Sequence, residues 1–327
     1  MDNRRHPLVV HTDPGLDDAL ALIHLAGLRA DLVAAGSVHG NLPAEAAAVN
    51  TLRVLELVGW DRVPVAVGAT RMWNGREPAP ELSGQVVHGP DGLGGRAGPP
   101  PAGTPVRESA AEQLVRLARD RPGELTVLEL GPLTNLALAL DLEPRLPRLL
   151  RRVVWMGGSF TEHGNVTPFA DANAFHDPEA AEHVLAAGFP LTLVPVDATA
   201  GAWADAGWVA AVEAASTPPA RRVADWMGHY VDAQTEEHGR RGCRLDDVVA
   251  AAIALDPGLA LVTQELEVTC ETAGHCRGRL LTDRRPVRFG VALPPRPPVE
   301  VVLEARTDEV LRRLLRTLTG GPGGSPP

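Results

Sequence analysis

Three aspartates crowd around a tight turn near the start of the chain. A Pro-Gly turn follows Asp13, and Asp17 and Asp18 come at the start of a predicted amphipathic helix. Capping of the helix and its dipole would explain one or two of these carboxylates. Three carboxylates held so close repel one another unless a cation or shared protons relieve the repulsion. The spacing therefore points to a cation site.

The ligand types narrow the choice of cation. Carboxylate oxygens without cysteine or paired histidine favour calcium or magnesium over zinc. A phosphotransferase that forms an aspartyl phosphate is the competing interpretation of an acidic turn after a strand. That chemistry needs an Asp-x-Asp pair directly after the strand, and the first of those positions is His11.

The elements around this turn alternate between buried strands and helices. Apolar runs bounded by turn residues predict strands at Leu8–Val10, Leu32–Val38, Val63–Val67, Leu125–Leu130, Val153–Met156 and Leu191–Val196. Helices are predicted at Asp17–Leu28, Ala44–Val58, Ser109–Ala118, Thr134–Leu140 and Pro178–Ala187. This order predicts an α/β fold, a single open-sheet domain with a mainly parallel mixed sheet flanked by helices. Ligands bind beyond the carboxyl ends of the strands in such sheets, where the acidic turn lies.

The pattern changes after Thr199. We expect helices at Ala202–Ala215, Pro219–Glu237 and Leu245–Leu255, an antiparallel patch of Leu266–Thr272, Arg279–Thr282 and Val299–Ala305, and a last helix at Asp308–Leu318. Arg71–Val106, rich in Gly and Pro, is predicted to be a long functional loop. We predict one domain over residues 1–319 and a disordered Gly/Pro tail over 320–327.

Composition excludes several classes of function. A formal net charge of -10 argues against a nucleic-acid partner. The chain contains no lysine, so neither a Schiff-base lysine nor a P-loop lysine is present. Its three cysteines lack zinc-like spacing. The first residues lack the apolar core of a secretory signal, and no apolar run is long enough for a bilayer, so we expect a cytoplasmic protein without a membrane partner.

The stretch from His11 to Ala21, HTDPGLDDALA, resembles the DxDPGxDDxxA signature of the inosine-uridine nucleoside hydrolase family. Further segments resemble family landmarks in the right order across nearly the whole chain: VHGN at Val38–Asn41, HGPDGLG at His88–Gly94, LGPLTNLA at Leu130–Ala137, MGG at Met156–Gly158, GNVTPFADANAFHDPEAA at Gly164–Ala181 and LDDVVAAAIALDP at Leu245–Pro257. The resemblance implies hydrolysis of the N-glycosidic bond of ribonucleosides to ribose and free base. It also implies a homodimer or homotetramer.

The resemblance also implies roles for single residues. Ca²⁺ would be bound by Asp13, Asp18 and Asp247 and by the backbone carbonyl of Leu130. The ion would hold a water and the 2′- and 3′-hydroxyls of ribose, with Asp13 as the general base that activates this water. The remaining implied residues bind the sugar: Asp17 at the 2′-hydroxyl, Asn41 and Asn173 in the pocket, and Asn165 and Asp171 toward the 5′-hydroxyl.

Three positions depart from the family pattern. His11 replaces the first Asp of the signature, and it either partners Asp13 or Asp247 or is a satisfied strand-end histidine. Asp171 stands where Glu is usual, which would loosen the 5′ contact or leave room for a 5′-substituent.

The third departure is Asp246, which replaces a His that protonates the leaving base. It is either a neutral acid that substitutes for this His or an ionised neighbour that points away. His88, His11 or His229 could supply the proton instead, and His88 lies on the loop expected to close over the base. Trp73, in the same long loop, could stack on a purine.

Two alternatives to an ordinary nucleoside hydrolase stay open. The altered positions are compatible with an enzyme of the same fold that acts on a 5′-modified or C-linked nucleoside. A catalytically silent ribose- or nucleoside-binding protein is the second alternative. The retained carboxylates argue against it, since binding alone does not need Asp13 as a base. The base preference also stays open.

Overall fold

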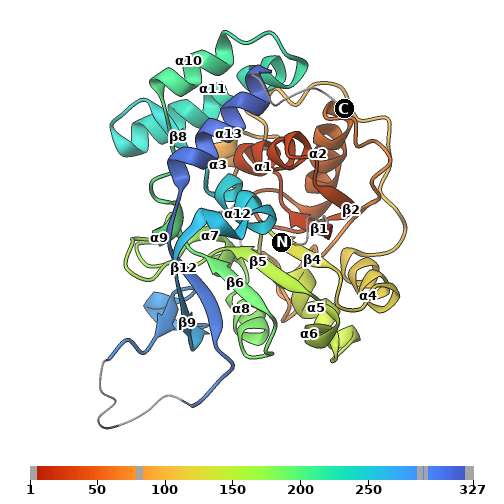
Figure 1. Cartoon of the computed structure of the whole chain (residues 1–327), viewed down its shortest axis with the longest axis vertical. Coiled ribbons are helices and arrows are strands. Elements are labelled where there is room, and N and C mark those ends of the chain that lie inside the picture. The colour runs from red at the N-terminus through yellow and green to blue at the C-terminus, as the bar shows by residue number, and fades with distance from the viewer. Residues whose placement is uncertain (1–5, 79–83, 286–289, 291–293, 321–327) are drawn as a thin grey trace.

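An eight-stranded sheet forms the centre of the molecule in the computed structural model, which describes residues 6–78, 84–285, 290 and 294–320 (Figure 1). The strand order is β3-β2-β1-β4-β5-β6-β12-β9. The strands are β1 (Pro7–Thr12), β2 (Asp31–Ser37), β3 (Val65–Ala66), β4 (Thr126–Glu129), β5 (Arg152–Met156), β6 (Leu191–Val194), β9 (Ala260–Leu266) and β12 (Val299–Ala305). All neighbouring pairs are parallel except β12 and β9.

Helices cover both faces of the sheet, which is why its strands are apolar on both sides. Successive residues of β1 show this, because Leu8 and Val10 join one hydrophobic cluster while Val9 joins the other. The first cluster includes residues of α1 (Leu16–Gly27), α2 (Ala44–Leu57), α10 (Ala206–Glu213), α11 (Pro218–His238), α12 (Asp246–Leu255) and α13 (Thr307–Thr319). The second includes residues of α4 (Ala110–Asp120), α5 (Thr134–Leu142), α6 (Leu146–Leu149) and α8 (Pro178–Leu185).

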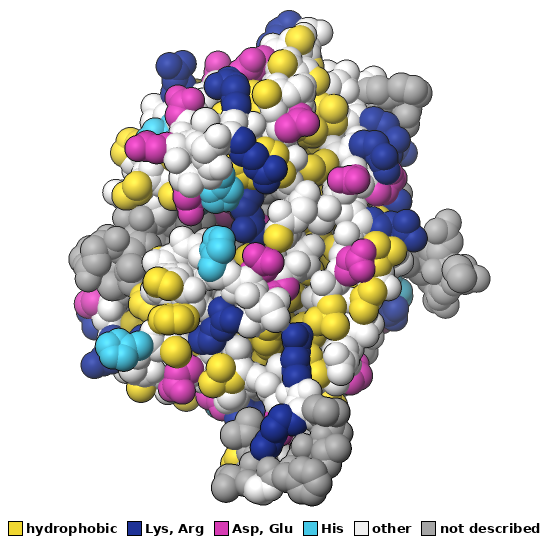
Figure 2. Space-filling view, turned by 90° about the vertical axis from the view of Figure 1, so that its left-hand side faces the viewer, with side chains coloured by type: hydrophobic (Ala, Val, Ile, Leu, Met, Phe, Trp, Pro, Cys, Tyr) yellow, Lys and Arg dark blue, Asp and Glu magenta, His cyan; other side chains and the backbone are white. Residues whose placement is uncertain are grey.

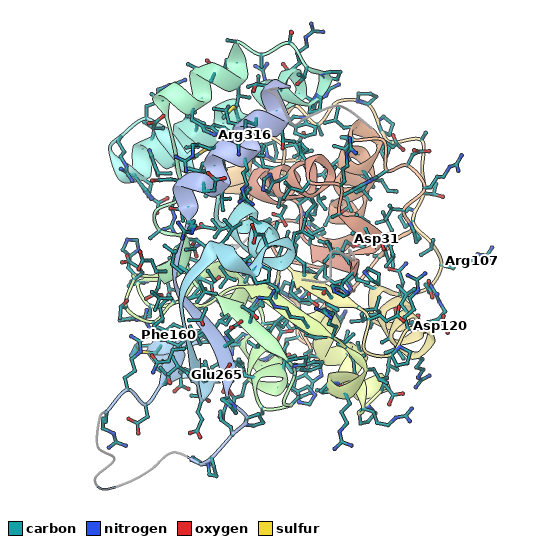
Figure 3. All side chains as sticks on the ribbon, viewed as in Figure 1. Asp31, Arg107, Asp120, Phe160, Glu265 and Arg316 are labelled. Atoms are coloured by element: carbon teal, nitrogen blue, oxygen red, sulfur yellow. The ribbon has the colours of Figure 1, made fainter. Side chains whose placement is uncertain are left out.

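Short elements complete the fold. Two small antiparallel pairs, β7 (Trp203–Asp205) with β8 (Gly242–Arg244) and β10 (Val268–Cys270) with β11 (Leu280–Thr282), lie outside the main sheet. Helical turns occur at α3 (Gln85–His88), α7 (Ala172–His176), α9 (Val196–Thr199), η2 (Pro257–Leu259) and η3 (Gly274–Cys276). Exposed side chains such as Asp31, Arg107 and Glu265 mark the outside of the molecule (Figure 3). None of the helices in the described residues is long and apolar enough to cross a membrane.

The predicted fold class is confirmed, and so are the six strands and five helices expected before Thr199. Two predictions about the second half were wrong, and one strand was not predicted. The helix expected from Ala202 begins with β7, and α10 starts at Ala206. Val299–Ala305 does not belong to a separate patch, because β12 pairs with β6 in the main sheet. The edge strand β9 was missed because most of its side chains are exposed and carry no apolar alternation.

Two further predictions reach into residues outside the described part of the chain. The long loop contains the short helix α3, and its residues 79–83 are not described. Gly320 ends α13 in the left-handed conformation, and residues 321–327 of the predicted tail are not described. What matters for function is the carboxyl edge of the sheet, where the segments after β1, β4 and β5 come together.

Candidate active site

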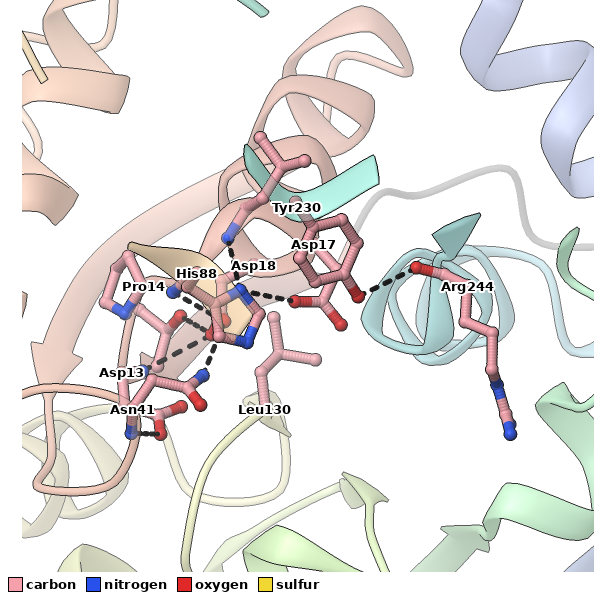
Figure 4. A network of polar contacts seen from close by, with 12 residues as sticks. Asp13, Pro14, Asp17, Asp18, Asn41, His88, Leu130, Tyr230 and Arg244 are labelled. Atoms are coloured by element: carbon pink, nitrogen blue, oxygen red, sulfur yellow. Dashed lines mark hydrogen bonds and ion pairs between the residues drawn. The ribbon is translucent and has the colours of Figure 1, made fainter. Parts of the chain in front are cut away.

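The acidic turn is built where β1 passes into α1. Gly15 precedes the helix, and its N–H donates to the Asp18 carboxylate over 3.0 Å. The Thr12 hydroxyl donates to the other oxygen of Asp18 over 2.5 Å. Asp18 therefore caps the helix, as the simpler interpretation of the sequence requires. Figure 4 shows that Asp13, Asp17 and Asp18 nevertheless lie close together on this turn.

Asp13 is held between two backbone segments. Its Oδ2 accepts a hydrogen bond of 2.7 Å from the Asn41 N–H. Gly40 and Gly131 flank the carboxylate so closely that a Cβ at either position would collide with it. Its Oδ1 is buried and has no hydrogen-bond partner among the described residues. A buried carboxylate oxygen without a donor is costly, so this atom is suited to a ligand.

Asp247 reaches the same place from the other end of the chain, at the start of α12. One carboxylate oxygen from each of Asp17, Asp18 and Asp247 lies within 4.8 Å of the others, and all three residues are buried. Asp247 also shares a hydrogen bond with Asp18. The predicted convergence of Asp18 and Asp247 is therefore observed, and Asp13 adjoins the cluster through its N–H, which donates to Asp18 over 3.3 Å.

The electrostatics of the cluster follow from burial and crowding. Burial raises the pKa of Asp13, Asp17 and Asp247 well above the usual value, and the neighbouring carboxylates raise it further. Burial also raises the pKa of Asp18, although its hydrogen bonds act in the opposite direction. A divalent cation would remove this repulsion, and oxygen ligands are those that calcium and magnesium prefer. The described residues could hold such an ion.

The segments after β4 and β5 supply the next part of the site. The Leu130 carbonyl, at the end of β4, accepts a hydrogen bond of 2.8 Å from the Asn173 side chain. The same Nδ2 donates to the Met156 carbonyl over 3.0 Å, so Asn173 ties the two strand ends together. Its side-chain oxygen has no hydrogen bond to the described residues, and Asn173 is 8% exposed. Leu130 and Asn173 therefore present oxygen atoms beside the acidic cluster.

Asp171 is more constrained than the sequence suggested. It caps α7, accepting hydrogen bonds from the backbone N–H groups of Asn173 and Ala174, and it also accepts one from Gly158 over 2.5 Å. Burial raises its pKa to about 6, against the effect of these hydrogen bonds. Asn165 lies next to it and accepts from the Ala172 N–H over 2.8 Å, which orients its side-chain NH₂ group away from that bond.

A cleft of about 280 Å³ opens above these groups. It is lined by most of the predicted site residues: Asp17, Asn41, His88, Leu130, Asn165, Asp171, Asn173, Asp246 and Asp247. Asp13 and Asp18 lie beneath it, with exposures of 1% and 0%. Histidine, arginine and acidic side chains gather near mid-height on one face of the molecule (Figure 2). The structure thus brings all the predicted site residues into or under one cleft.

His88 lies against the start of α1. Its Nδ1 accepts a hydrogen bond of 3.1 Å from the Leu16 N–H and is 4.0 Å from an oxygen of Asp17. Its ring stacks on Tyr230 with centroids 4.9 Å apart. Burial and, to a smaller extent, the neighbouring His229 lower the pKa of His88 to about 4. At neutral pH the ring is therefore neutral, with its proton on Nε2, and can donate a hydrogen bond.

Asp246 is paired with an arginine that the sequence analysis did not single out. The Arg244 Nη2 donates to the Asp246 carboxylate over 2.8 Å, and both side chains are about nine-tenths buried, with exposures of 11% and 10%. A guanidinium at this distance stabilises the ionised carboxylate. Asp246 therefore lines the cleft as the partner of Arg244.

His11 shares a hydrogen bond of 2.9 Å with Glu129 at full burial, so of its two alternatives the contact supports the strand-end histidine and not a partner of Asp13 or Asp247. Two other expectations need correction. The His229 Nε2 donates a hydrogen bond of 2.9 Å to the Val86 carbonyl and so links α11 to α3. Trp73 stacks on His183 and donates to Asp141, outside the lining of the cleft, so the prediction that it meets a purine was wrong.

Part of the lining was missed entirely. Tyr230, Gln234 and His238 of α11 face the cleft, and they recur every four residues, the spacing of one helical face. Tyr230 is the single tyrosine of the chain, and its hydroxyl donates to the Arg244 carbonyl over 2.9 Å. The spacing was visible in the sequence, but nothing there indicated that this face of α11 meets the carboxyl edge of a distant sheet.

Comparisons with known proteins agree with this geometry. The family model described as inosine-uridine preferring nucleoside hydrolase matches residues 8–312. The chain is 32% identical to probable uridine nucleosidase 2 of Arabidopsis thaliana, over 96% of this chain and 98% of that protein. It is 36% identical to the pyrimidine-specific ribonucleoside hydrolase RihA of an Enterobacter species, over 85% of this chain and 88% of that protein.

Solved structures give the same result. The plant nucleoside hydrolase PpNRh1 superposes with a TM-score of 0.91 at 28% identity, covering 97% of this chain and 99% of that one. A purine-preferring ribonucleoside hydrolase from Gardnerella vaginalis superposes with a TM-score of 0.87 at 25% identity, covering 96% and 98%.

Proposed function

The chain belongs to the inosine-uridine preferring nucleoside hydrolase family and hydrolyses ribonucleosides, and from this premise we propose that it works with a bound calcium ion and with Asp13 as general base. The observation that carries the proposal is the meeting of Asp17, Asp18 and Asp247 at the cleft. These carboxylates come from α1 and α12, which are more than two hundred residues apart in the chain.

The residues present fit a calcium ion. Two members of the observed cluster, Asp18 and Asp247, would hold it. Asp13 and the Leu130 carbonyl would complete an all-oxygen set. The partnerless Oδ1 of Asp13 and the raised pKa values of the cluster support this assignment. When bound, the ion supplies positive charge that lowers the pKa of water and holds the ribose diol.

Asp13 would remove a proton from the attacking water. Burial and the carboxylates of Asp18 and Asp17 raise the pKa of Asp13, so its carboxylate is a stronger base than a solvated one. The Asn41 N–H fixes one of its oxygens, and the other has no hydrogen-bond partner among the described residues. The new bond joins the water oxygen to C1′, and the bond from C1′ to the base nitrogen breaks.

The ribose would be held by the remaining predicted residues. Asp17, which lines the cleft, would accept a hydrogen bond from the 2′-hydroxyl and so stabilise an oxocarbenium-like transition state. Asn41 and Asn173 line the same cleft. Asn165 and Asp171 would read the 5′-hydroxyl, Asn165 through its free NH₂ group and Asp171 through lone pairs that its backbone donors leave unused.

The substrate, location and assembly are also proposals. Relatives named uridine nucleosidase and pyrimidine-specific ribonucleoside hydrolase support uridine as the first substrate to test. Three free cysteines support a reducing compartment such as the cytoplasm. Exposed Leu261 and Val262 on the edge strand β9 support a homodimer or homotetramer, which sedimentation analysis would measure.

Release of free base tests the proposed function. Uridine, cytidine, inosine and adenosine would be incubated with protein as purified, with protein treated with a chelator, and with chelated protein to which Ca²⁺ is returned. We expect base release that is lost on chelation and restored by Ca²⁺. Binding without base release from any nucleoside would refute the hydrolase, and base release that is indifferent to chelation would refute the role of the metal.

A further inference from the structure

Arg244 is the one arginine among the described residues that line the cleft. Its hydrogen bonds to described residues both come from Nη2, at 2.8 Å to Asp246 and 3.4 Å to the Thr199 hydroxyl. Its Nε is buried and has no partner there. A guanidinium has five N–H donors, so Arg244 keeps donors for a ligand.

The fold holds this side chain in place. Arg244 is the strand partner of Trp203 at the end of the β7–β8 ribbon. Its backbone carbonyl accepts a hydrogen bond from the Tyr230 hydroxyl. Asp246, two residues later at the start of α12, lies beside the guanidinium. Burying such a pair is costly unless the remaining donors are used. The position is therefore suited to a substrate group with oxygen acceptors.

The charges around Arg244 indicate which group of the substrate it binds. The acidic side chains Asp17, Asp246 and Asp247 line the cleft, and His88 is neutral. In the hydrolysis proposed above, negative charge develops on the departing base, because the electron pair of the C1′–N bond stays with it. Among the described lining residues, Arg244 supplies the permanent positive charge that can stabilise the negative charge on the departing base.

We propose that Arg244 is a catalytic residue that stabilises the departing base, an inference that rests on the proposed hydrolase function. As C1′–N breaks, the electron pair delocalises onto a carbonyl oxygen of the base, which accepts a hydrogen bond from the guanidinium. Arg244 gives up no proton, and the base anion is protonated by solvent after it leaves. The substrates are thus nucleosides of oxo-bases, such as uridine or inosine, and adenosine is disfavoured.

The test compares two leaving groups. Removing one preorganised donor costs about 10²–10³-fold in rate. We expect Arg244→Gln to lower kcat/KM for uridine by about this factor. p-Nitrophenyl riboside has a good leaving group, and its kcat/KM should fall less than about tenfold, which also shows that the variant folds. Arg244→Lys keeps the positive charge but lacks the planar, forked guanidinium. Its kcat/KM for uridine should lie between those of the wild type and Arg244→Gln. Arg241→Gln, on the exposed neighbour paired with Glu213, is the matched control and should leave both activities unchanged.

Three outcomes would overturn the proposal. Equal losses on uridine and p-nitrophenyl riboside would mean that Arg244 does not act on the base. A loss that disappears when 5′-deoxyuridine replaces uridine would assign Arg244 to the 5′ end of the sugar. Asp246→Asn keeps an oxygen acceptor for Arg244 and should lose less activity on uridine than Arg244→Gln; an equal loss would make Asp246 the proton donor. Wild-type protein that fails even on p-nitrophenyl riboside would instead refute the hydrolase function itself.

Discussion

Asp247→Asn should stabilise the metal-free protein and abolish its response to calcium. Without a cation, Asp247 is a buried carboxylate that faces those of Asp17 and Asp18 within 4.8 Å. The amide has nearly the same shape, carries no charge, and can donate to Asp18 as a protonated Asp247 does. The same change removes a proposed calcium ligand. The variant should therefore be more stable than the wild type without metal, and it should not be stabilised by calcium.

The separation of the carboxylates sets the expected gain in stability. Two unit charges 4.8 Å apart repel by about 3.5 kcal/mol at an effective dielectric constant of about 20. The hydrogen bond between Asp247 and Asp18 already relieves part of this repulsion, so we expect a gain of about 1–2 kcal/mol. For a chain of 327 residues that corresponds to a rise of about 1.5–3 °C in the Tm of the metal-free protein.

The pH dependence follows from the same pKa shifts. Burial raises the folded-state pKa of Asp13, Asp17 and Asp247 above the unfolded value. Such groups contribute stability that is present below the unfolded pKa and is lost as the pH rises through the folded pKa. The metal-free wild type should therefore lose stability as the pH rises from about 4, and Asp247→Asn should lose less over this range.

Differential scanning calorimetry of chelated protein, with and without added Ca²⁺, measures both effects. Calcium at about 100 times its Kd should stabilise the wild type by about 2.7 kcal/mol and leave the variant unchanged. Asp197→Asn is the matched control, because Asp197 accepts hydrogen bonds from three backbone N–H groups and the pKa of its carboxyl is lowered despite burial. That variant should be less stable in both states with the calcium response intact. A calcium response retained by Asp247→Asn, or a Tm that falls as in the control, would refute the reasoning.

Other expectations address the catalytic groups. Asp13→Asn should lower kcat by about 10²–10⁴-fold with a smaller effect on KM; near wild-type kcat in a base-release assay would exclude Asp13 as the base. Asp171→Glu should change the ratio of kcat/KM for uridine and 5′-deoxyuridine, and an unchanged ratio would mean that Asp171 only caps α7. Gly131→Ala should weaken calcium binding in a titration, because its Cβ would lie 2.9 Å from the Asp13 Oδ1; an unaltered affinity would contradict the proposed use of that oxygen. His88→Phe keeps the stacking on Tyr230 but removes the acceptor for the Leu16 N–H, so it should lower the Tm.

The sequence by itself determined the sheet, the acidic turn and the family resemblance. Buried parallel strands appear in a sequence as continuous apolar runs. The turn after β1 is local, so Asp13, Asp17 and Asp18 could be placed from neighbouring residues alone. The edge strand β9 could not be found in this way, because its exposed side chains leave no apolar pattern. The antiparallel partner that defines it, β12, comes more than thirty residues later.

Only the tertiary structure decided which groups meet in the cleft. The role of Asp246 was ambiguous in the sequence because it depends on the partner of this carboxylate, and that partner, Arg244, is identified by a side-chain contact. His11 was similarly ambiguous until Glu129 of a neighbouring strand was placed beside it. The face of α11 that carries Tyr230 reaches the site through packing between distant segments. Residue types and spacing encode local geometry, whereas charge state and contact depend on neighbours that folding brings from elsewhere in the chain.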